Sequence, residues 1–170
     1  MMVLQYADKG SFDNYKYFFK NYNWCERITI LQHIIKGLKK IHGDFHVGNI
    51  LTFDFRHNFI NDDAINTVCI SDMGLCREVD NIDKTKIYGV MPYVAPEVLK
   101  GKPYTQAADI YSFGMIMYFI ATGRQPFANC AHDNTLALNI CNGIRPEISE
   151  NEVPKCYIDL MKKCWDSNPE

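Results

Sequence analysis

The chain has 170 residues, 47% of them hydrophobic, so length and composition predict one domain with one sizeable core. Its net charge of −2, with 22% charged residues, excludes a strong long-range attraction to nucleic acid or anionic lipid. No apolar run approaches the roughly 18 residues of a membrane span, and the N-terminus lacks a signal-peptide pattern. We therefore expect a cytoplasmic domain that neither spans a membrane nor binds nucleic acid.

The seven cysteines form no C-x-x-C pair, and they lie within apolar stretches of the sequence. A disulfide framework or a zinc site would need tighter clusters of cysteine. The pattern favours buried, reduced thiols.

The N-terminal part of the sequence begins with a short apolar segment, Val3–Tyr6, that predicts a strand, and turn-forming residues follow at 8–11. The aromatic stretch 12–22 is expected to be helical in part. Through residues 26–42 apolar side chains recur at steps of three and four, which predicts an amphipathic helix. Gly43 suits the chain reversal that would end it.

Two β-like segments, Ile50–Phe55 and Thr67–Ile70, predict a small β element, with an inserted, solvent-exposed loop over 56–66. The segment Gln106–Ala121 is apolar on almost every side, which predicts a helix buried at the centre of the domain. We expect Thr105 to cap its start.

Two further helices are predicted near the C-terminal end. One spans Asn134–Cys141, and Pro154 opens the other at its first turn, with Ile158, Met161 and Trp165 on the inner face. The sequence thus predicts a predominantly helical α+β domain.

Three motifs occur in a fixed order: Ile-His-Gly-Asp-Phe-His-Val-Gly-Asn over 41–49, Ser-Asp-Met-Gly over 71–74 and Ala-Pro-Glu over 95–97. Phosphoryl transfer needs magnesium to neutralise phosphate charge, alignment of the attacking hydroxyl and an acceptor for its proton. Together these motifs resemble the catalytic loop, the magnesium-binding tripeptide and the end of the activation segment of eukaryotic-type protein kinases.

The resemblance implies ATP and Mg²⁺ as cofactors and gives three residues their roles. Asp44 would accept or orient the proton of the substrate hydroxyl. Asn49 would supply an amide oxygen, and Asp72 a carboxylate, to the magnesium that binds the phosphates.

The same resemblance implies residues for the rest of the nucleotide. His46 stands where Ser/Thr kinases have a lysine, so it would act on the charge of the γ-phosphate. Leu51 would form the floor under adenine, Tyr6 and Ala7 would present hinge backbone to its edge, and Ser11 would reach a ribose hydroxyl.

Other positions qualify the resemblance. Asp109 would anchor the catalytic-loop backbone, and Glu97 would pair with an arginine expected just past residue 170. Gly43 replaces the arginine that receives an activation-loop phosphate in many kinases. His46 and the pair Cys164-Trp165 resemble the tyrosine-kinase-like group, which mostly phosphorylates Ser and Thr.

Residues 1–12 resemble the last small-lobe strand and the hinge, and residues 13–170 resemble the large lobe. No glycine-rich loop, V-A-I-K-like lysine strand or helix with its partner glutamate is found. We therefore expect a protein-kinase-like α+β fold: a mainly helical large lobe with a small β element, the small lobe being largely missing.

The predicted function is a protein kinase catalytic-domain fragment for ATP-dependent phosphoryl transfer to protein Ser/Thr in signalling, weak or inactive as an isolated chain. A protein substrate and a small-lobe or scaffold partner are the expected partners. The alternative is a pseudokinase or interaction module without turnover. A small-molecule phosphotransferase of related fold is disfavoured, because Tyr93-x-Ala-Pro-Glu97 followed by the Asp109 helix resembles protein kinases specifically.

Overall fold

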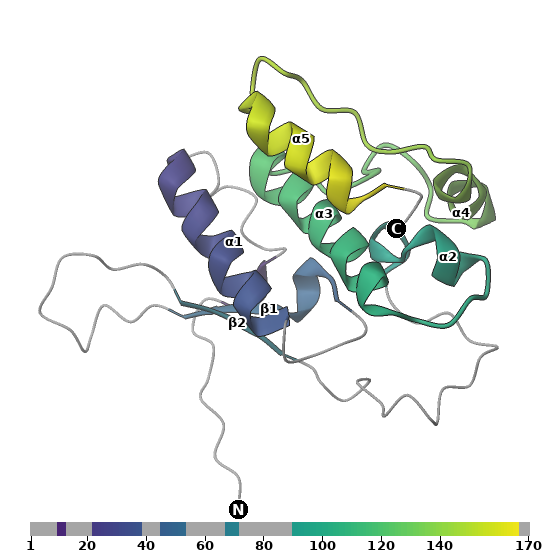
Figure 1. Ribbon diagram of the computed structural model, residues 1–170, viewed down its shortest axis with the longest axis horizontal. Coiled ribbons are helices and arrows are strands. Elements are labelled where there is room, and N and C mark those ends of the chain that lie inside the picture. Colours follow the sequence, from purple (N-terminus) through teal and green to yellow (C-terminus); the bar gives the residue numbers. More distant parts are fainter. Residues whose placement is uncertain (1–9, 13–21, 39–44, 54–66, 72–89, 167–170) are drawn as a thin grey trace, which may run out of the picture.

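The computed structural model describes residues 10–12, 22–38, 45–53, 67–71 and 90–166 (Figure 1). Within these residues the protein is mainly helical, with one two-stranded sheet. This arrangement confirms the predicted α+β fold and is consistent with a kinase large lobe. The strand predicted at Val3–Tyr6 lies outside the described residues.

Helix α1 (Trp24–Leu38) confirms the predicted amphipathic helix but begins two residues earlier than expected. Asn23 and Glu26 set this start, because each side chain accepts the other's backbone N–H, at 3.0 and 2.7 Å. The buried side chains follow the helical period and are Ile30, Leu31, Ile34 and Leu38. The predicted end near Gly43 lies in a part of the chain that the structure does not describe.

Strand β1 (Ile50–Phe53) pairs antiparallel with β2 (Thr67–Ile70), with Ile50 opposite Ile70. Figure 1 shows α1 lying across this small sheet, and α1 packs against β2. Residues 54–66, including the predicted loop and the last two residues of the predicted β1, fall outside the described ranges.

Helix α3 (Gln106–Thr122) is the centre of the domain, as its composition predicted. Every residue from 111 to 121 is buried. The helix packs against α1, against α5 (Lys155–Cys164) and against the 3-10 turn η5 (Met91–Tyr93). Figure 1 shows α3 running between α1 and α5.

Thr105 is the cap residue of α3, as predicted, and has the extended backbone of that position, but its side chain makes no cap hydrogen bond. Its carbonyl oxygen instead accepts the N–H of Ala108 at 3.0 Å, so the first turn closes through the backbone.

Helices α3 and α5 approach closely at Gly114. A Cβ atom at this position would lie 3.0 Å from the Cβ of Cys164 and 3.3 Å from the backbone nitrogen of Trp165. Tyr157 of α5 also donates its hydroxyl to the carbonyl of Met117 at 2.8 Å. The small residue and the buried hydrogen bond together fix α5 on the central helix.

The remaining helices are α2 (Pro96–Leu99) and α4 (Asn134–Cys141), which pack on each other. The bounds of α4 are those predicted, and Asp133 caps it by accepting two backbone N–H groups. Pro154 is the cap residue directly before α5, so it precedes the helix and does not lie in the first turn as predicted.

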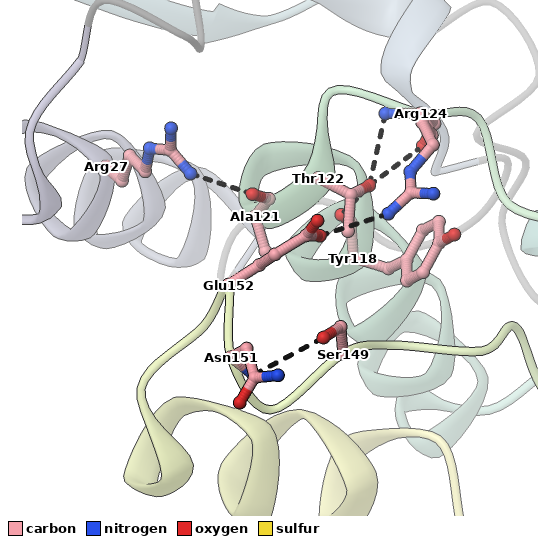
Figure 2. A network of polar contacts seen from close by, with 8 residues as sticks. All are labelled: Arg27, Tyr118, Ala121, Thr122, Arg124, Ser149, Asn151 and Glu152. Atoms are coloured by element: carbon pink, nitrogen blue, oxygen red, sulfur yellow. Dashed lines mark hydrogen bonds and ion pairs between the residues drawn. The ribbon is translucent and has the colours of Figure 1, made fainter.

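The C-terminal end of α3 is held by polar contacts. Figure 2 shows Arg27 of α1 pointing at this end, where its Nη1 donates to the carbonyl of Ala121 at 2.8 Å. Burial lowers the pKa of the Arg27 guanidinium, and the nearby Tyr157 opposes part of this change. A cation at a helix C-terminus is favourable, because it meets the negative end of the helix dipole. Arg124 and Glu152 form an ion pair at 3.3 Å, but both side chains are exposed, so the pair contributes little to the stability of the fold.

The cysteines differ from the prediction. The six described ones are free thiols, but Cys25, Cys69, Cys130 and Cys156 are exposed. Cys25 and Cys156 lie on solvent-facing positions of the first turns of α1 and α5, where apolar neighbours in sequence face the core instead. Cys164 is half-buried, and burial raises the pKa of its thiol.

In the part of the chain that the structure describes, no helix is long and apolar enough to cross a membrane.

Candidate functional site

The catalytic-loop segment enters the described structure at Phe45, which is buried, and continues into the 3-10 turn η2 (Val47–Asn49). His46 is the cap residue of this turn, and its Nδ1 accepts the backbone N–H of Gly48 at 3.1 Å. Because Nδ1 is the acceptor, the neutral imidazole carries its proton on Nε2. His46 is thereby fixed as a donor through Nε2.

Gly48 is required for this arrangement of the imidazole. A Cβ atom at position 48 would lie 2.9 Å from Cε1 of His46 and 3.0 Å from its Nδ1. Any larger residue would therefore have to displace the ring.

Asn49 is buried and connects the turn to the end of the sheet. Its backbone N–H donates to the carbonyl of His46 at 3.0 Å. Its own carbonyl accepts two hydrogen bonds from Ser71, from the backbone N–H at 2.7 Å and from Oγ at 3.1 Å. Ser71 is the residue directly before Asp72, so these hydrogen bonds join Asn49 to the sequence neighbour of the second predicted magnesium ligand.

Ser11, the described residue of the segment predicted to contact the nucleoside, lies beside β1. Ser11 forms an antiparallel bridge with Leu51, which pairs in turn with Cys69 of β2. Two predicted contact residues, one for ribose and one for adenine, are thus neighbours although they are far apart in sequence.

Four predicted site residues lie outside the described residues: Tyr6, Ala7, Asp44 and Asp72. Their roles remain predictions. Among the described residues, no group of three or more His, Cys, Asp or Glu side chains could hold a metal ion. The magnesium site predicted from the motifs depends instead on Asn49 and Asp72. An amide oxygen and a carboxylate are hard donors, and these fit Mg²⁺.

Asp109 of α3 is fully buried and accepts the hydroxyl of Tyr104 at 2.6 Å. Its predicted contact with the catalytic-loop backbone involves residues outside the described ranges. Glu97 of α2 is half-buried and makes no ion pair with any described residue.

Sequence reasoning missed the residues that surround His46. The ring of Tyr93 lies 6.4 Å from the His46 ring, centroid to centroid, with an interplanar angle of 48°. Tyr93 is buried, and its hydroxyl donates to Oε1 of Gln125 at 2.7 Å. The sequence carries no local signal for the hydrogen bond between Tyr93 and Gln125, because 32 positions separate these residues.

Comparison with known proteins places the chain in a family. The family model described as protein kinase domain matches residues 1–170. Two relatives from Dictyostelium discoideum, "Probable serine/threonine-protein kinase roco5" and "Probable serine/threonine-protein kinase roco8", are each 30% identical to it over 99% of its length. The alignments cover 6% and 10% of these relatives.

A third Dictyostelium discoideum protein, also named as a probable serine/threonine-protein kinase, is 34% identical over 76% of this chain and 7% of its own length. The chain therefore spans about a tenth or less of the length of the curated relatives it matches. The family match over all 170 residues agrees with the order of the three motifs and with the mainly helical fold, and the chain belongs to the protein kinase domain family.

Proposed function

We propose that this chain is the large-lobe part of a Ser/Thr protein kinase of the tyrosine-kinase-like group, with residues 1–12 as hinge and last small-lobe strand and 13–170 as large lobe. The observation that carries the proposal is the pair of hydrogen bonds from Ser71 to the carbonyl of Asn49. They join the catalytic-loop asparagine to the strand end that precedes Asp72. The names of the relatives support Ser and Thr as acceptors. A role in cytoplasmic signalling is part of the proposal.

In this proposal Asp44 accepts or orients the proton of the protein substrate's hydroxyl, so that the oxygen attacks the γ-phosphate. His46 donates a hydrogen bond from Nε2 to a γ-phosphate oxygen and so stabilises the negative charge that this group carries during transfer. A preorganised donor stabilises such charge without reorganising during the reaction. Phe45, the residue between Asp44 and His46 in sequence, is buried, which anchors the backbone directly before His46.

Magnesium supplies charge neutralisation to the ATP phosphates when it is bound. Asn49 and Asp72 are the proposed ligands. Asn49 is suited to this role because its backbone is fixed on both sides, by His46 and by Ser71, which limits the positions that its side chain can take.

The nucleoside is proposed to bind against Leu51, with Ser11 at the ribose and the backbone of Tyr6 and Ala7 at the adenine edge. The bridge between Ser11 and Leu51 supports this part, because it holds the two proposed contact residues side by side.

The second candidate is a pseudokinase or interaction module. It is favoured by one feature of the sequence, the glycine at position 43, which replaces the arginine that receives an activation-loop phosphate in many kinases. In this case the lobe would be a docking surface for a small lobe or a scaffold protein.

The test is phosphoryl transfer by a chimera in which the small lobe of the roco5 relative precedes residue 1. We expect Asp44→Asn to abolish transfer to a Ser/Thr substrate while sparing nucleotide binding, because Asp44 acts on the acceptor hydroxyl. Asp72→Asn should weaken binding of magnesium-ATP as well, because it removes a metal ligand. Transfer rate and nucleotide affinity are measured separately.

The outcomes separate the two candidates. Transfer that survives Asp44→Asn unchanged would refute the role of this residue. A folded chimera that binds a scaffold but transfers no phosphate in any variant would favour the pseudokinase.

A further inference from the structure

Two groups to which the motifs assign no catalytic role surround the imidazole of His46. The backbone N–H of Gly48 donates to Nδ1 at 3.1 Å. The buried ring of Tyr93 lies 6.4 Å from the imidazole, between ring centroids. The first contact sets the tautomer, and the second limits the rotation of the ring.

Tyr93 is itself fixed at both ends. Its hydroxyl donates to Oε1 of Gln125 at 2.7 Å, and its carbonyl accepts the Oγ hydroxyl of Ser112 at 2.7 Å. Ser112 belongs to the central helix α3, and Gln125 follows the C-terminal end of that helix. The position of the Tyr93 ring therefore depends on the most buried element of the domain.

We propose that Tyr93 and Gln125 are positioning residues for phosphoryl transfer and act through His46. This inference rests on the proposed function, in which His46 donates from Nε2 to the γ-phosphate. Gln125 orients the Tyr93 ring, and the ring keeps the imidazole where Gly48 can hold Nδ1. A donor fixed in this way needs no reorientation when phosphate charge develops.

Two variants break the hydrogen bond between Tyr93 and Gln125 without removing the tyrosine ring that packs in the core. Tyr93→Phe deletes the hydroxyl, and Gln125→Met deletes its acceptor at similar side-chain length. Gln125→Glu keeps an acceptor oxygen and is the matched control. In the small-lobe chimera we expect each of the first two to lower kcat by about 3- to 10-fold, the size of one hydrogen bond. KM for ATP should stay within about twofold, and Gln125→Glu should stay within about twofold of the unmutated rate.

A double-mutant cycle distinguishes positioning from general packing. If Tyr93 and Gln125 act through His46, then neither Tyr93→Phe nor Gln125→Met lowers kcat further in a His46→Ala background. The same 3- to 10-fold loss in that background would overturn the inference, because the two residues would then act independently of His46.

A spectroscopic measurement on the 170-residue chain needs no turnover. The ¹⁵N shifts of the His46 imidazole, assigned by its loss in His46→Gln, should show a proton on Nε2. Gly48→Ala should give mixed tautomers, because its Cβ would displace the ring. Mixed tautomers already in the unmutated chain would overturn the inference.

The failures of the two proposals can be told apart. If Asp44→Asn abolishes transfer while His46→Ala, Tyr93→Phe and Gln125→Met leave kcat unchanged, only the positioning inference is wrong. If no variant of the chimera transfers phosphate, the proposed function is wrong, and so is the proposed role of Tyr93 and Gln125 in phosphoryl transfer.

Discussion

Two buried tyrosine hydroxyls on the central packing interface differ in their partners. Tyr157 donates to the carbonyl of Met117 at 2.8 Å. The hydroxyl of Tyr111 is buried and finds no hydrogen-bond partner among the residues that the structure describes. A buried polar group without a partner carries its desolvation cost uncompensated. The same side chain type therefore has opposite effects on stability at these two positions.

We predict that Tyr111→Phe raises the free energy of unfolding by about 1 kcal/mol, because it removes an unpartnered hydroxyl and keeps the ring. Tyr157→Phe is the matched control and should lower it by about 1 kcal/mol, because it removes the buried hydrogen bond from the tyrosine hydroxyl to the Met117 carbonyl. Urea unfolding of the unmutated protein and of the two variants measures both changes in the free energy of unfolding. Equal destabilisation by the two substitutions would mean that Tyr111 has a partner.

The same two tyrosines predict how stability depends on alkaline pH. Burial raises the pKa of both above the ordinary value of 10.0, and Arg145 and Arg27 respectively oppose part of the rise. In the unfolded chain these phenols ionise near pH 10, whereas in the folded chain they stay protonated. The unfolded state therefore loses protons first, so the free energy of unfolding is unaffected below pH 10 and falls above it.

The expected slope is about 1.4 kcal/mol per pH unit for each buried tyrosine, once the pH is well above 10. Urea unfolding between pH 8 and pH 11 should show a shallower decline for Tyr111→Phe than for the unmutated protein. An identical decline in both would show that Tyr111 ionises freely in the folded state.

At the scale of elements, α3 joins the parts of the domain that are far apart in sequence. Arg145 adds to this on one side: its guanidinium lies 5.2 Å from the centre of the Tyr111 ring. It also donates to the carbonyl of Trp165 after α5, at 2.8 Å, and to that of Ile140 in α4, at 3.0 Å. One cation thus satisfies carbonyl groups at the C-terminal ends of α4 and α5 and also lies against a ring of α3.

We predict that Phe113→Ala in α3 lowers the free energy of unfolding by about 3–5 kcal/mol, because it removes a large side chain that is only 8% exposed. Leu160→Ala in α5 is the control: this side chain is 54% exposed, so the change should cost under about 0.5 kcal/mol. A small loss for Phe113→Ala on urea unfolding would mean that the core does not centre on α3.

At the scale of the whole molecule, the described elements hold only one side of the proposed nucleotide site. Leu51, Asn49 and His46 follow one another along η2 and β1, and Ser11 is joined to them by its bridge to Leu51. No segment of the sequence matches the glycine-rich loop or the lysine strand that cover the phosphates in kinases.

We predict that residues 1–170 on their own transfer little or no phosphate, because positioning and exclusion of water supply most of the rate in this reaction. The measurement is transfer of radiolabelled phosphate from magnesium-ATP to a generic protein substrate, beside the Asp72→Asn variant. Turnover near 1 s⁻¹, the lower end of the range of about 1–100 s⁻¹ typical of kinases, and its loss in the variant, would contradict this expectation.

The sequence by itself determined helices α1, α3, α4 and α5, the small sheet and the central position of α3, whereas the short helix α2 was not predicted. Each of these depends on a local periodicity or on an apolar composition that only one environment can satisfy. It also determined the family, because the order of the motifs over 41–49, 71–74 and 95–97 is a property of the chain.

Only the tertiary structure decided what surrounds the predicted site residues. The ring contact of Tyr93 with His46 and the hydrogen bonds of Tyr93 with Gln125 and of Ser71 with Asn49 join positions that are 22 to 47 residues apart. The exposure of Cys25 and Cys156, and the unpartnered hydroxyl of Tyr111, likewise depend on which helix face meets a neighbour. A local pattern can state that a helix has an inner face. Which polar atoms meet there, and which remain without a partner, follows only when the helices pack.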